Sequence, residues 1–492
     1  MPAFVGWLGR QKFRLLSFCL PLCVYLLCLN GVYSSDYPTS ILGMQYAMWA
    51  RHSLSLGAGG NLIAQSADLS VFAGNYYSAL SPGFAILSFP FAALGFVLDG
   101  NTLNLWGWSL VMDEVFVAIC SAVAVLLVYE IARFYASERA SLVAAFALAF
   151  ATPLWPASTV LFIHGTSLMF AMSSIYMVLR YDRGKIGSRG LLAAGALLGL
   201  AGFVEYVALL FVVPLALYLA VRRFRRVLPV FLAGFSLGPA AQLTYNFVAF
   251  QNPFLFPEQL KGGASGSIIS EFNLPSAVVH LSYYLVSPYR GILFFSPIAI
   301  LGLYALLRLA GNRIPRRDAV LFISAFALPL VTYSSWTDWA GGLFYGPRFL
   351  ILGFPSLLIP LAPILDEWRS RKFGVLVLAL FGVSSFVEGA GALTTAFSIE
   401  GPPGTFQLAG LNLPWLLQGK LDSWWVSWAN LPSGMWVILP VGTFALLWIG
   451  MTYGVLAGRL PSLQSVAKGA SPGLPAKGKT KTIVDPEKEL KT

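Results

Sequence analysis

Residues 110–132 read LVMDEVFVAICSAVAVLLVYEIA, a mostly apolar run that is long enough to cross a bilayer as a single helix. Similar runs recur along almost the whole chain. They lie near 14–33, 140–157, 160–179, 190–204, 206–221, 227–249, 292–311, 318–335, 349–365, 373–396 and 433–457. The sequence therefore predicts an all-α polytopic membrane protein with about 12 transmembrane helices.

The composition favours a membrane protein over a soluble one. Of the 492 residues, 57% are hydrophobic and 11% are charged, whereas soluble domains carry about 25% charged residues. We expect one large transmembrane domain over 1–457. The remaining segment, 458–492, is rich in Pro, Gly and Lys and has no aromatic residue. It is predicted to be a disordered, basic cytoplasmic tail.

The distribution of basic residues predicts the orientation, because cytoplasmic loops carry an excess of Lys and Arg. If the shorter apolar stretch 83–98 does not span, 27 of the 32 basic residues fall inside and five fall outside. We therefore expect 83–98 to lie at the interface or to re-enter. Both termini are then cytoplasmic, in a multi-pass protein of the inner or plasma membrane. The five outer basic residues are Arg51, Lys261, Arg290, Arg348 and Lys420.

The first outer loop, 34–108, has internal order. Asp36 follows the first span directly, and apolar positions recur at helical spacing from Ile41 onward. This pattern predicts an amphipathic helix on the outer membrane surface, with Gln45 facing water. The polar, aromatic stretch GNYYSALSPG, which contains Tyr77, is interpreted as a turn that leads into 83–98.

Ionisable groups near the outer ends of the spans are the candidate functional residues, because charges are costly in a membrane. Each has a structural alternative. Asp36 could cap a helix, His164 and Glu205 could be interhelical hydrogen bonders, and the arginines could anchor on lipid headgroups. Their shared depth favours one site at the outer leaflet boundary, where a substrate half in lipid would meet them. The set comprises Asp36, Asp113, Glu114, His164, Glu205, Tyr206, Arg290, Asp338, Arg348 and Glu388.

The sequence indicates neither a metal centre nor a nucleic-acid partner. The chain has three histidines, and its four cysteines lie in apolar stretches without paired spacing. The net charge of +11 is spread over several loops and forms no single basic patch. No Gly-rich nucleotide-binding loop is present. We therefore predict no metal ligand and no certain cofactor, and leave a divalent cation open.

Several short motifs together resemble a known family. In order, they are GNYYSALSPG, IARFYASERA, ATPLWPASTVLFIHGTS, GFVEY, SPYRGILFFSP and WAGGLFYGPRF. With Asp36 just after the first span, this order resembles the membrane glycosyltransferases of the GT-C fold, related to protein O-mannosyltransferases and lipid A aminoarabinose transferase. The likeness runs roughly from Asp36 to Pro363. Such enzymes often carry two adjacent acidic residues in the first outer loop, whereas Asp36 stands alone between Ser35 and Tyr37.

The resemblance implies an enzyme that transfers a hexosyl or pentosyl group from a polyprenyl-phosphate donor to a glycan, lipid or protein acceptor at the outer face. The residue chemistry agrees with an inverting transfer, in which a carboxylate takes the acceptor proton. Arginines can stabilise the growing charge of the leaving phosphate. Asp36 is thus the expected catalytic base, and the expected substrate-binding residues are Tyr77, His164, Glu205, Tyr206, Arg290, Asp338 and Arg348.

Two other classes remain open from the sequence. A transporter or flippase of lipid-linked sugars would also need many spans and buried charges. Its usual features, internal repeats and half-helices that meet at the midplane, are not visible. A structural subunit that uses the outer surface only to hold a partner is the third reading. In every case we expect membrane lipids as direct partners.

Overall fold

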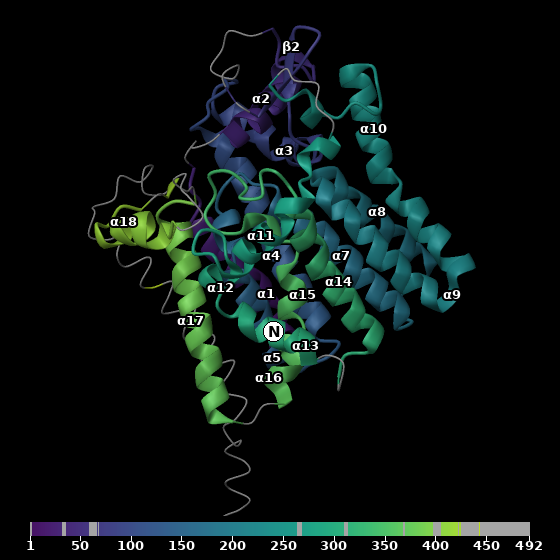
Figure 1. Ribbon diagram of the computed structural model, residues 1–492, viewed down its shortest axis with the longest axis vertical. Helices are drawn as coiled ribbons and strands as arrows, with labels where there is room; N and C mark the ends of the chain where they lie inside the picture. Colours follow the sequence, from purple (N-terminus) through teal and green to yellow (C-terminus); the bar gives the residue numbers. More distant parts are fainter. Residues whose placement is uncertain are drawn as a thin grey trace, which may run out of the picture.

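A computed structural model of the chain describes residues 2–31, 36–58, 66, 68–262, 268–308, 313–367, 370–396, 405–421, 423–424 and 442, without the side chains of 2–10, 222–226, 268 and 269. These residues form a helical bundle with one small β-hairpin (Figure 1). Apart from residue 442, the expected last span and the expected tail lie outside the described residues.

The first half of the chain contains α1 (Pro2–Leu27), α2 (Asp36–Arg51), β1 (Leu69–Phe72), β2 (Asn75–Ser78), α3 (Pro82–Leu98), α4 (Trp108–Ala132), α5 (Glu138–Phe150), α6 (Leu154–Ala157), α7 (His164–Asp182), α8 (Ser188–Val204), η2 (Tyr206–Phe211), α9 (Val212–Phe235) and α10 (Leu237–Phe250). The second half contains η3 (Pro257–Leu260), η4 (Ile268–Glu271), α11 (Leu274–Val286), α12 (Ile292–Phe295), α13 (Ala299–Arg308), α14 (Arg316–Ser334), η5 (Arg348–Leu350), α15 (Phe354–Leu358), α16 (Leu361–Glu367), α17 (Arg371–Leu393), η6 (Leu408–Asn412) and α18 (Leu413–Leu417).

Four helical segments of the described chain are long and apolar enough to cross a membrane, judged by length and composition. They are α4, the segment Val227–Phe250 in α9 and α10, α14 and α17. All four fall on spans expected from hydropathy. Several further apolar helices, such as α3 and α8, are shorter than a full span. The chain is therefore a helical membrane protein, and the total of twelve spans stays a prediction.

Three expected spans are wrong as single helices, because proline interrupts them. Proline lacks the backbone N–H and clashes with the preceding turn, so it breaks a helix interior. The expected span 140–157 divides into α5 and α6, 292–311 divides into α12 and α13, and 349–365 divides into η5, α15 and α16. The breaks contain Pro153, Pro297 and Pro360.

Helix α4 lies at the centre of the bundle and packs against α1, α3, α5 and α7. Farther out, α8 packs on the second half of α9 and on α10 through glycines. A Cβ at Gly195 would lie 1.9 Å from the carbonyl oxygen of Phe231, and one at Gly238 would lie 1.9 Å from that of Gly199. Small residues let membrane helices approach this closely. These contacts show that α8 and the second half of α9 run in the same direction. The segment between them, η2 and the first half of α9, therefore runs in the opposite direction.

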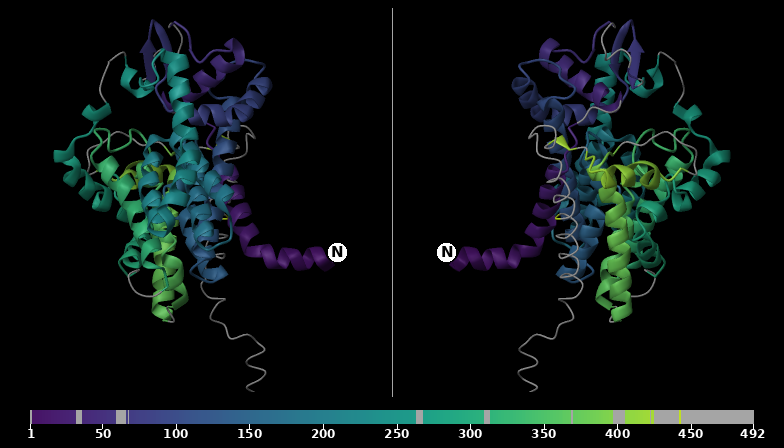
Figure 2. Two further views of the ribbon diagram at one scale, coloured as in Figure 1. Left: turned by 90° about the vertical axis from the view of Figure 1, so that its right-hand side faces the viewer. Right: turned by 90° about the vertical axis from the view of Figure 1, so that its left-hand side faces the viewer.

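The first segment expected outside lies at one end of the molecule, where α2, α3 and the hairpin are found together, whereas α11 and α18 of the other two lie nearer its middle (Figures 1 and 2). β1 pairs antiparallel with β2, so part of GNYYSALSPG is a strand and not only a turn. The two central residues, Ala73 and Gly74, have φ values of 47° and 77°, as the tight hairpin turns require. Ser70 Oγ donates to the carbonyl of Pro257 at 2.5 Å, which joins the first long outer segment to the second.

Helix α2 forms as expected, but it is packed inside the fold and does not lie freely on a surface. Ile41 and Met44 are buried, and Gln45, expected to face water, is fully buried. Its Nε2 donates to Ser88 Oγ at 2.9 Å and lies 3.3 Å from Asp113 Oδ1. The expectation for Gln45 was wrong because α3 and α4 cover this face of the helix.

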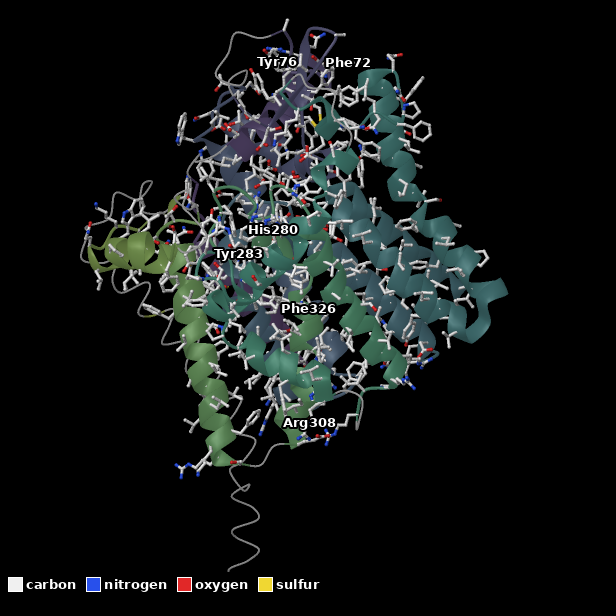
Figure 3. All side chains as sticks on the ribbon, viewed as in Figure 1. Phe72, Tyr76, His280, Tyr283, Arg308 and Phe326 are labelled. Atoms are coloured by element: carbon white, nitrogen blue, oxygen red, sulfur yellow. The ribbon has the colours of Figure 1, made fainter. Side chains whose placement is uncertain are left out.

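The opposite end of the molecule is held by a buried carboxylate. Figure 3 shows Arg308 at this end, far from Phe72 and Tyr76 of the hairpin. Asp318, in the first turn of α14, is fully buried. It accepts hydrogen bonds from the hydroxyls of Tyr135 at 2.7 Å and Tyr218 at 2.8 Å, and from Arg183 at 3.0 Å. This Asp318 anchor ties the ends of α4 and α7 to α9 and α14.

Candidate active site

The guanidinium of Arg348 lies in a cage of aromatic rings near the hairpin end of the molecule. Its Cζ is 4.8 Å from the ring centroid of Phe162, 4.9 Å from that of Phe349 and 5.8 Å from that of Tyr37. The Tyr37 and Phe162 centroids are 4.7 Å apart. A cation over aromatic faces is stabilised without being neutralised. Arg348 Nε is buried and has no hydrogen-bond partner among the described residues, so it can still bind an anion.

Asp36 is the first residue of α2, next to Tyr37 of this cage. Its side chain is half-buried, and no hydrogen bond or ion pair of its carboxylate is found within the described part of the chain. Only its backbone carbonyl is engaged, by Ser66 Oγ at 3.3 Å. Burial raises the pKa of the neighbouring Tyr37 hydroxyl, which therefore stays neutral at physiological pH. Asp36 is therefore adjacent in the chain to a residue of the cage, and no described residue engages its carboxylate.

His164 and Glu205 form a buried pair against the same aromatic rings. His164 Nδ1 lies 3.2 Å from Glu205 Oε1, and because a carboxylate only accepts, the proton sits on Nδ1. The hydroxyl of Tyr333 donates to the same oxygen at 3.0 Å. The ring of Tyr333 stacks on Phe349 with centroids 4.1 Å apart and an interplanar angle of 2°. The pair is therefore linked through two rings to the face that supports Arg348.

Two atoms of this pair have no partner in the described residues. They are His164 Nε2 and Glu205 Oε2, both buried. Buried polar atoms are nearly always hydrogen-bonded, to protein or to ordered water. Together with Arg348 Nε, they make a set of unmet hydrogen-bonding groups around the aromatic cage. Such a set can bind a polar ligand that is absent from the structure.

Arg290, expected at the donor phosphate, is fully buried in the loop between α11 and α12. It donates to three backbone carbonyls, those of Tyr289 at 2.9 Å, Ala340 at 2.7 Å and Gly342 at 2.8 Å. Two of these belong to the loop that leads to Arg348. The structure therefore shows Arg290 as a support of that loop, and its contact with a phosphate stays a prediction.

The remaining predicted residues lie around the cage and not in it. Asp338 is exposed in the loop that Arg290 holds. Tyr206 follows Glu205 directly but packs elsewhere, with its ring 5.7 Å from that of Phe256. Tyr77 lies at the end of β2, with its ring 5.1 Å from that of Phe250. These two tyrosines belong to a second cluster on the α10 side.

Sequence reasoning missed four aromatic residues of the site, one of which is Tyr37, the neighbour of Asp36. Phe162 and Phe349 stand within two residues of His164 and Arg348, so their place beside predicted site residues was the available signal. Tyr333 gave no signal, because it lies in an apolar helix among other aromatics. Its role depends on the hydrogen bond to Glu205, which only the folded chain reveals.

The acidic groups near the site are dispersed or already paired. Among the described residues, no group of three or more His, Cys, Asp or Glu side chains could hold a metal ion. Asp36 is single, and Asp68 lies 2.8 Å from Lys261 Nζ. Glu205 is paired with His164. These residues do not assemble a set of cation ligands, so we assign no reaction step to a divalent cation.

The chain has known relatives in sequence and in fold. The family model for dolichyl-phosphate-mannose-protein mannosyltransferase matches residues 91–240. No curated protein matches the chain. Two solved structures of ArnT from Cupriavidus metallidurans are similar. The one bound to undecaprenyl phosphate has a TM-score of 0.56 and 17% identity, covering 91% of this chain and 77% of that one. The apo form has a TM-score of 0.52 and 16% identity, with 92% and 77% covered.

A third structure is the Archaeoglobus fulgidus oligosaccharyltransferase in complex with Zn and sulfate. Its TM-score is 0.53 at 14% identity, and the match covers 79% of this chain and 54% of that one. This chain therefore spans about half the length of that protein. The matched family and these relatives are glycosyltransferases with one common architecture. The chain has the fold of the GT-C membrane glycosyltransferases.

Proposed function

We propose that this protein transfers a sugar from a polyprenyl-phosphate donor to a glycan, lipid or protein acceptor at the outer face of the membrane. Both termini then face the cytoplasm, and the hairpin end faces outward. The single observation that carries the proposal is the caged guanidinium of Arg348, whose buried Nε has no partner among the described residues. Asp36, which adjoins Tyr37 of the cage in the chain, adds a carboxylate without a partner among the described residues, in a membrane protein of this fold.

Arg348 is the proposed contact of the donor phosphate. Phosphate recognition favours the planar fork of arginine over the point charge of lysine. The rings of Phe162 and Phe349 lie 4.8 and 4.9 Å from the guanidinium carbon and hold it in place. With its proton on Nδ1, His164 leaves Nε2 as an unmet acceptor, which suits a hydroxyl of the substrate and not the phosphate. A leaving phosphate gains charge in the transition state, and groups fixed in advance stabilise that charge best.

Asp36 is the proposed base. The acceptor hydroxyl oxygen attacks the anomeric carbon and its proton passes to the Asp36 carboxylate. The bond from the anomeric carbon to the phosphate oxygen breaks, and the polyprenyl phosphate leaves with the electron pair. A single displacement of this kind inverts the configuration. The half-buried position of Asp36 at the start of α2 leaves the carboxylate accessible to an acceptor.

The test is an assay of the purified chain in lipid nanodiscs with polyprenyl-phosphate sugars, in which released polyprenyl phosphate is measured. Asp36→Asn should slow release by about 10²–10⁴-fold, the usual contribution of a general base. Its melting temperature should be unchanged, because Asn caps helices about as well as Asp.

Asp99→Asn is the matched control. Asp99 caps the start of α4, where its two carboxylate oxygens accept from the N–H groups of Trp108 and Ser109 at 2.8 and 2.9 Å. This variant should keep its activity. If Asp36→Asn stays within a few-fold of wild type, Asp36 is not the base, and Glu205 and Asp68 become the next candidates. A chain that moves lipid-linked sugars across the bilayer but never releases polyprenyl phosphate would be a flippase.

A further inference from the structure

A second cluster of polar and aromatic side chains lies on the α10 side of the active site. We name it the tyrosine cluster and define it by Tyr77, Tyr206, Gln242 and Tyr245. The residues come from β2, η2 and α10, so three separate segments of the chain meet here. Phe250 joins two of them, with its ring centroid 5.1 Å from that of Tyr77 and 6.1 Å from that of Tyr245. The Tyr206 side chain lies near Ser81, Gln242 and Tyr245.

Three polar atoms of the tyrosine cluster are buried without a hydrogen-bond partner in the described chain. They are the hydroxyls of Tyr206 and Tyr245 and the Oε1 of Gln242. The Gln242 and Tyr245 side chains are only 5% and 4% exposed, so bulk water does not satisfy them. The other end of Gln242 is engaged, because its Nε2 donates to Asn246 Oδ1 at 2.8 Å. Leaving such groups unmet is costly, which points to a partner that the structure does not contain.

The chemistry of the cluster selects among ligands. Two hydroxyls can donate or accept, and the free amide oxygen of Gln242 can only accept. Three aromatic rings, those of Tyr77, Tyr206 and Phe250, surround these groups. A sugar ring presents hydroxyls that donate and accept, together with an apolar C–H face that lies well on an aromatic ring. A lipid tail would leave all three polar atoms unmet. A phosphate is disfavoured because none of the four residues that define the cluster carries a positive charge.

The position of the cluster connects it to the reaction. Tyr206 follows Glu205 in the chain, and the two side chains point to different places, Glu205 to His164 and Tyr206 to the cluster. Tyr206 and the neighbouring Phe256 are half-buried, so the cluster borders the surface on this side. A sugar ring bound to Tyr206 would therefore contact the residue that follows Glu205 of the active site in the chain.

We propose that the tyrosine cluster is a carbohydrate subsite that binds one sugar ring of the acceptor. The acceptor is then a glycan or a glycosylated molecule, which narrows the three acceptor classes of the proposed function, on which this inference rests. Tyr245 and Gln242 fix the ring through its hydroxyls, and Tyr206 closes the side next to the active site. None of these groups takes part in the bond changes of the transfer.

The experiment measures sugar binding directly, without turnover. The full chain in nanodiscs is titrated with four probes, the methyl glycosides of mannose, glucose, galactose and N-acetylglucosamine. Contact with the ring protons is followed by saturation-transfer difference NMR. We expect at least one glycoside to bind. Its affinity should fall about threefold to tenfold in Tyr245→Phe, which removes one hydrogen bond to the sugar, and at least as much in Gln242→Leu, which also removes the hydrogen bond to Asn246.

Tyr76→Phe is the matched control, because Tyr76 neighbours Tyr77 on β2 but does not belong to the cluster, and it should bind like wild type. Tyr206→Phe, at a half-buried position, serves as the second variant if a buried substitution lowers the melting temperature. Binding of none of the four glycosides, or equal binding by wild type and all variants, would overturn the subsite. Arg348→Lys should bind glycosides normally while losing donor turnover, so failure of the subsite and failure of the proposed transferase reaction are told apart.

Discussion

His164 Nδ1 lies 3.2 Å from Glu205 Oε1, with both side chains only 5% exposed. The two residues come from the start of α7 and the end of α8, so their contact fixes one helix end against another. It also fixes the tautomer of the histidine, which leaves the buried Nε2 as an acceptor without a partner among the described residues. The pair therefore serves both packing and the proposed chemistry.

Replacing Glu205 tests both parts of this role. Glu205→Gln keeps the shape but removes the charge that accepts hydrogen bonds from His164 and Tyr333. Hydrogen bonds to charged groups contribute about 1.5–3 kcal/mol, so thermal unfolding should occur at a clearly lower temperature and donor turnover should fall. Glu138→Gln is the matched control, because the Arg133–Glu138 pair is 41% exposed on both sides and such pairs contribute about 0–1 kcal/mol. Equal melting temperatures for the two variants would contradict a stabilising role for the buried pair.

Arg348→Lys should lose most of the donor turnover while the protein still inserts and folds. The guanidinium carbon lies 4.8 and 4.9 Å from the Phe162 and Phe349 ring centroids, and a lysine ammonium cannot reproduce the planar group or its two-pronged hydrogen bonding. Polyprenyl phosphate release and the KM for the donor are the measurements. Arg290→Ala should behave differently and lower the melting temperature as well, since it leaves three backbone carbonyls without their donor. Wild-type turnover in both variants would instead assign the arginines to lipid anchoring.

We expect Glu258, in the segment 251–290 that is expected outside, to make the free energy of unfolding depend on pH. Burial raises the pKa of its carboxyl above the ordinary value, and Asp68 adds to this effect while Lys261 opposes it. The neutral form is thus favoured in the folded state. Its contribution to the free energy of unfolding is full below the ordinary pKa of glutamate, about 4.3, and is lost as the pH rises through the raised value.

Glu258→Gln removes the ionisable group and keeps the neutral shape. The variant should match wild type near pH 4 and melt at a higher temperature than wild type near pH 8, where wild type must hold a partly buried carboxylate. Melting temperatures of both proteins from pH 4 to pH 8 provide the check. A difference that stays constant over this range would mean that the titration of Glu258 does not affect folding.

The membrane orientation is testable by labelling single cysteines. In a background without Cys19, Cys23, Cys28 and Cys120, Ser188→Cys should react only with a reagent on the inside. Ser265→Cys should react only from the outside. The basis is the excess of basic residues on the expected cytoplasmic side. Ser188 is exposed at the start of α8, so the thiol is accessible in the folded protein. Labelling of both positions from the same side would refute the topology.

Hydropathy predicted the four long helices, because a run of about 20 apolar residues has few alternatives to a spanning helix. It failed where proline divides an apolar run, as between α5 and α6, since apolar composition does not report backbone breaks. Hydropathy also placed Gln45 in water. A glutamine on an amphipathic helix carries no sign of whether another helix will cover it.

The sequence predicted the charged residues of the candidate site but not the aromatic residues that contact them. Costly charges such as Arg348 and Glu205 stand out in an apolar sequence, so their chemistry was visible. Their partners were not, because contacts such as Tyr333 with Glu205 join residues far apart in the chain. Arg290 illustrates the limit. Its charge suggested a phosphate, whereas the fold uses its donors on backbone carbonyls.

The Asp318 anchor restricts how the bundle can move. It joins α4, α7, α9 and α14 at one end, and α14 carries Tyr333 of the active site about 22 Å away along the same helix. Helices that are pinned at one end separate most at the other. On the proposed function, we therefore expect a polyprenyl chain to enter between these helices beside the aromatic cage and not near Asp318, where the buried contacts resist separation.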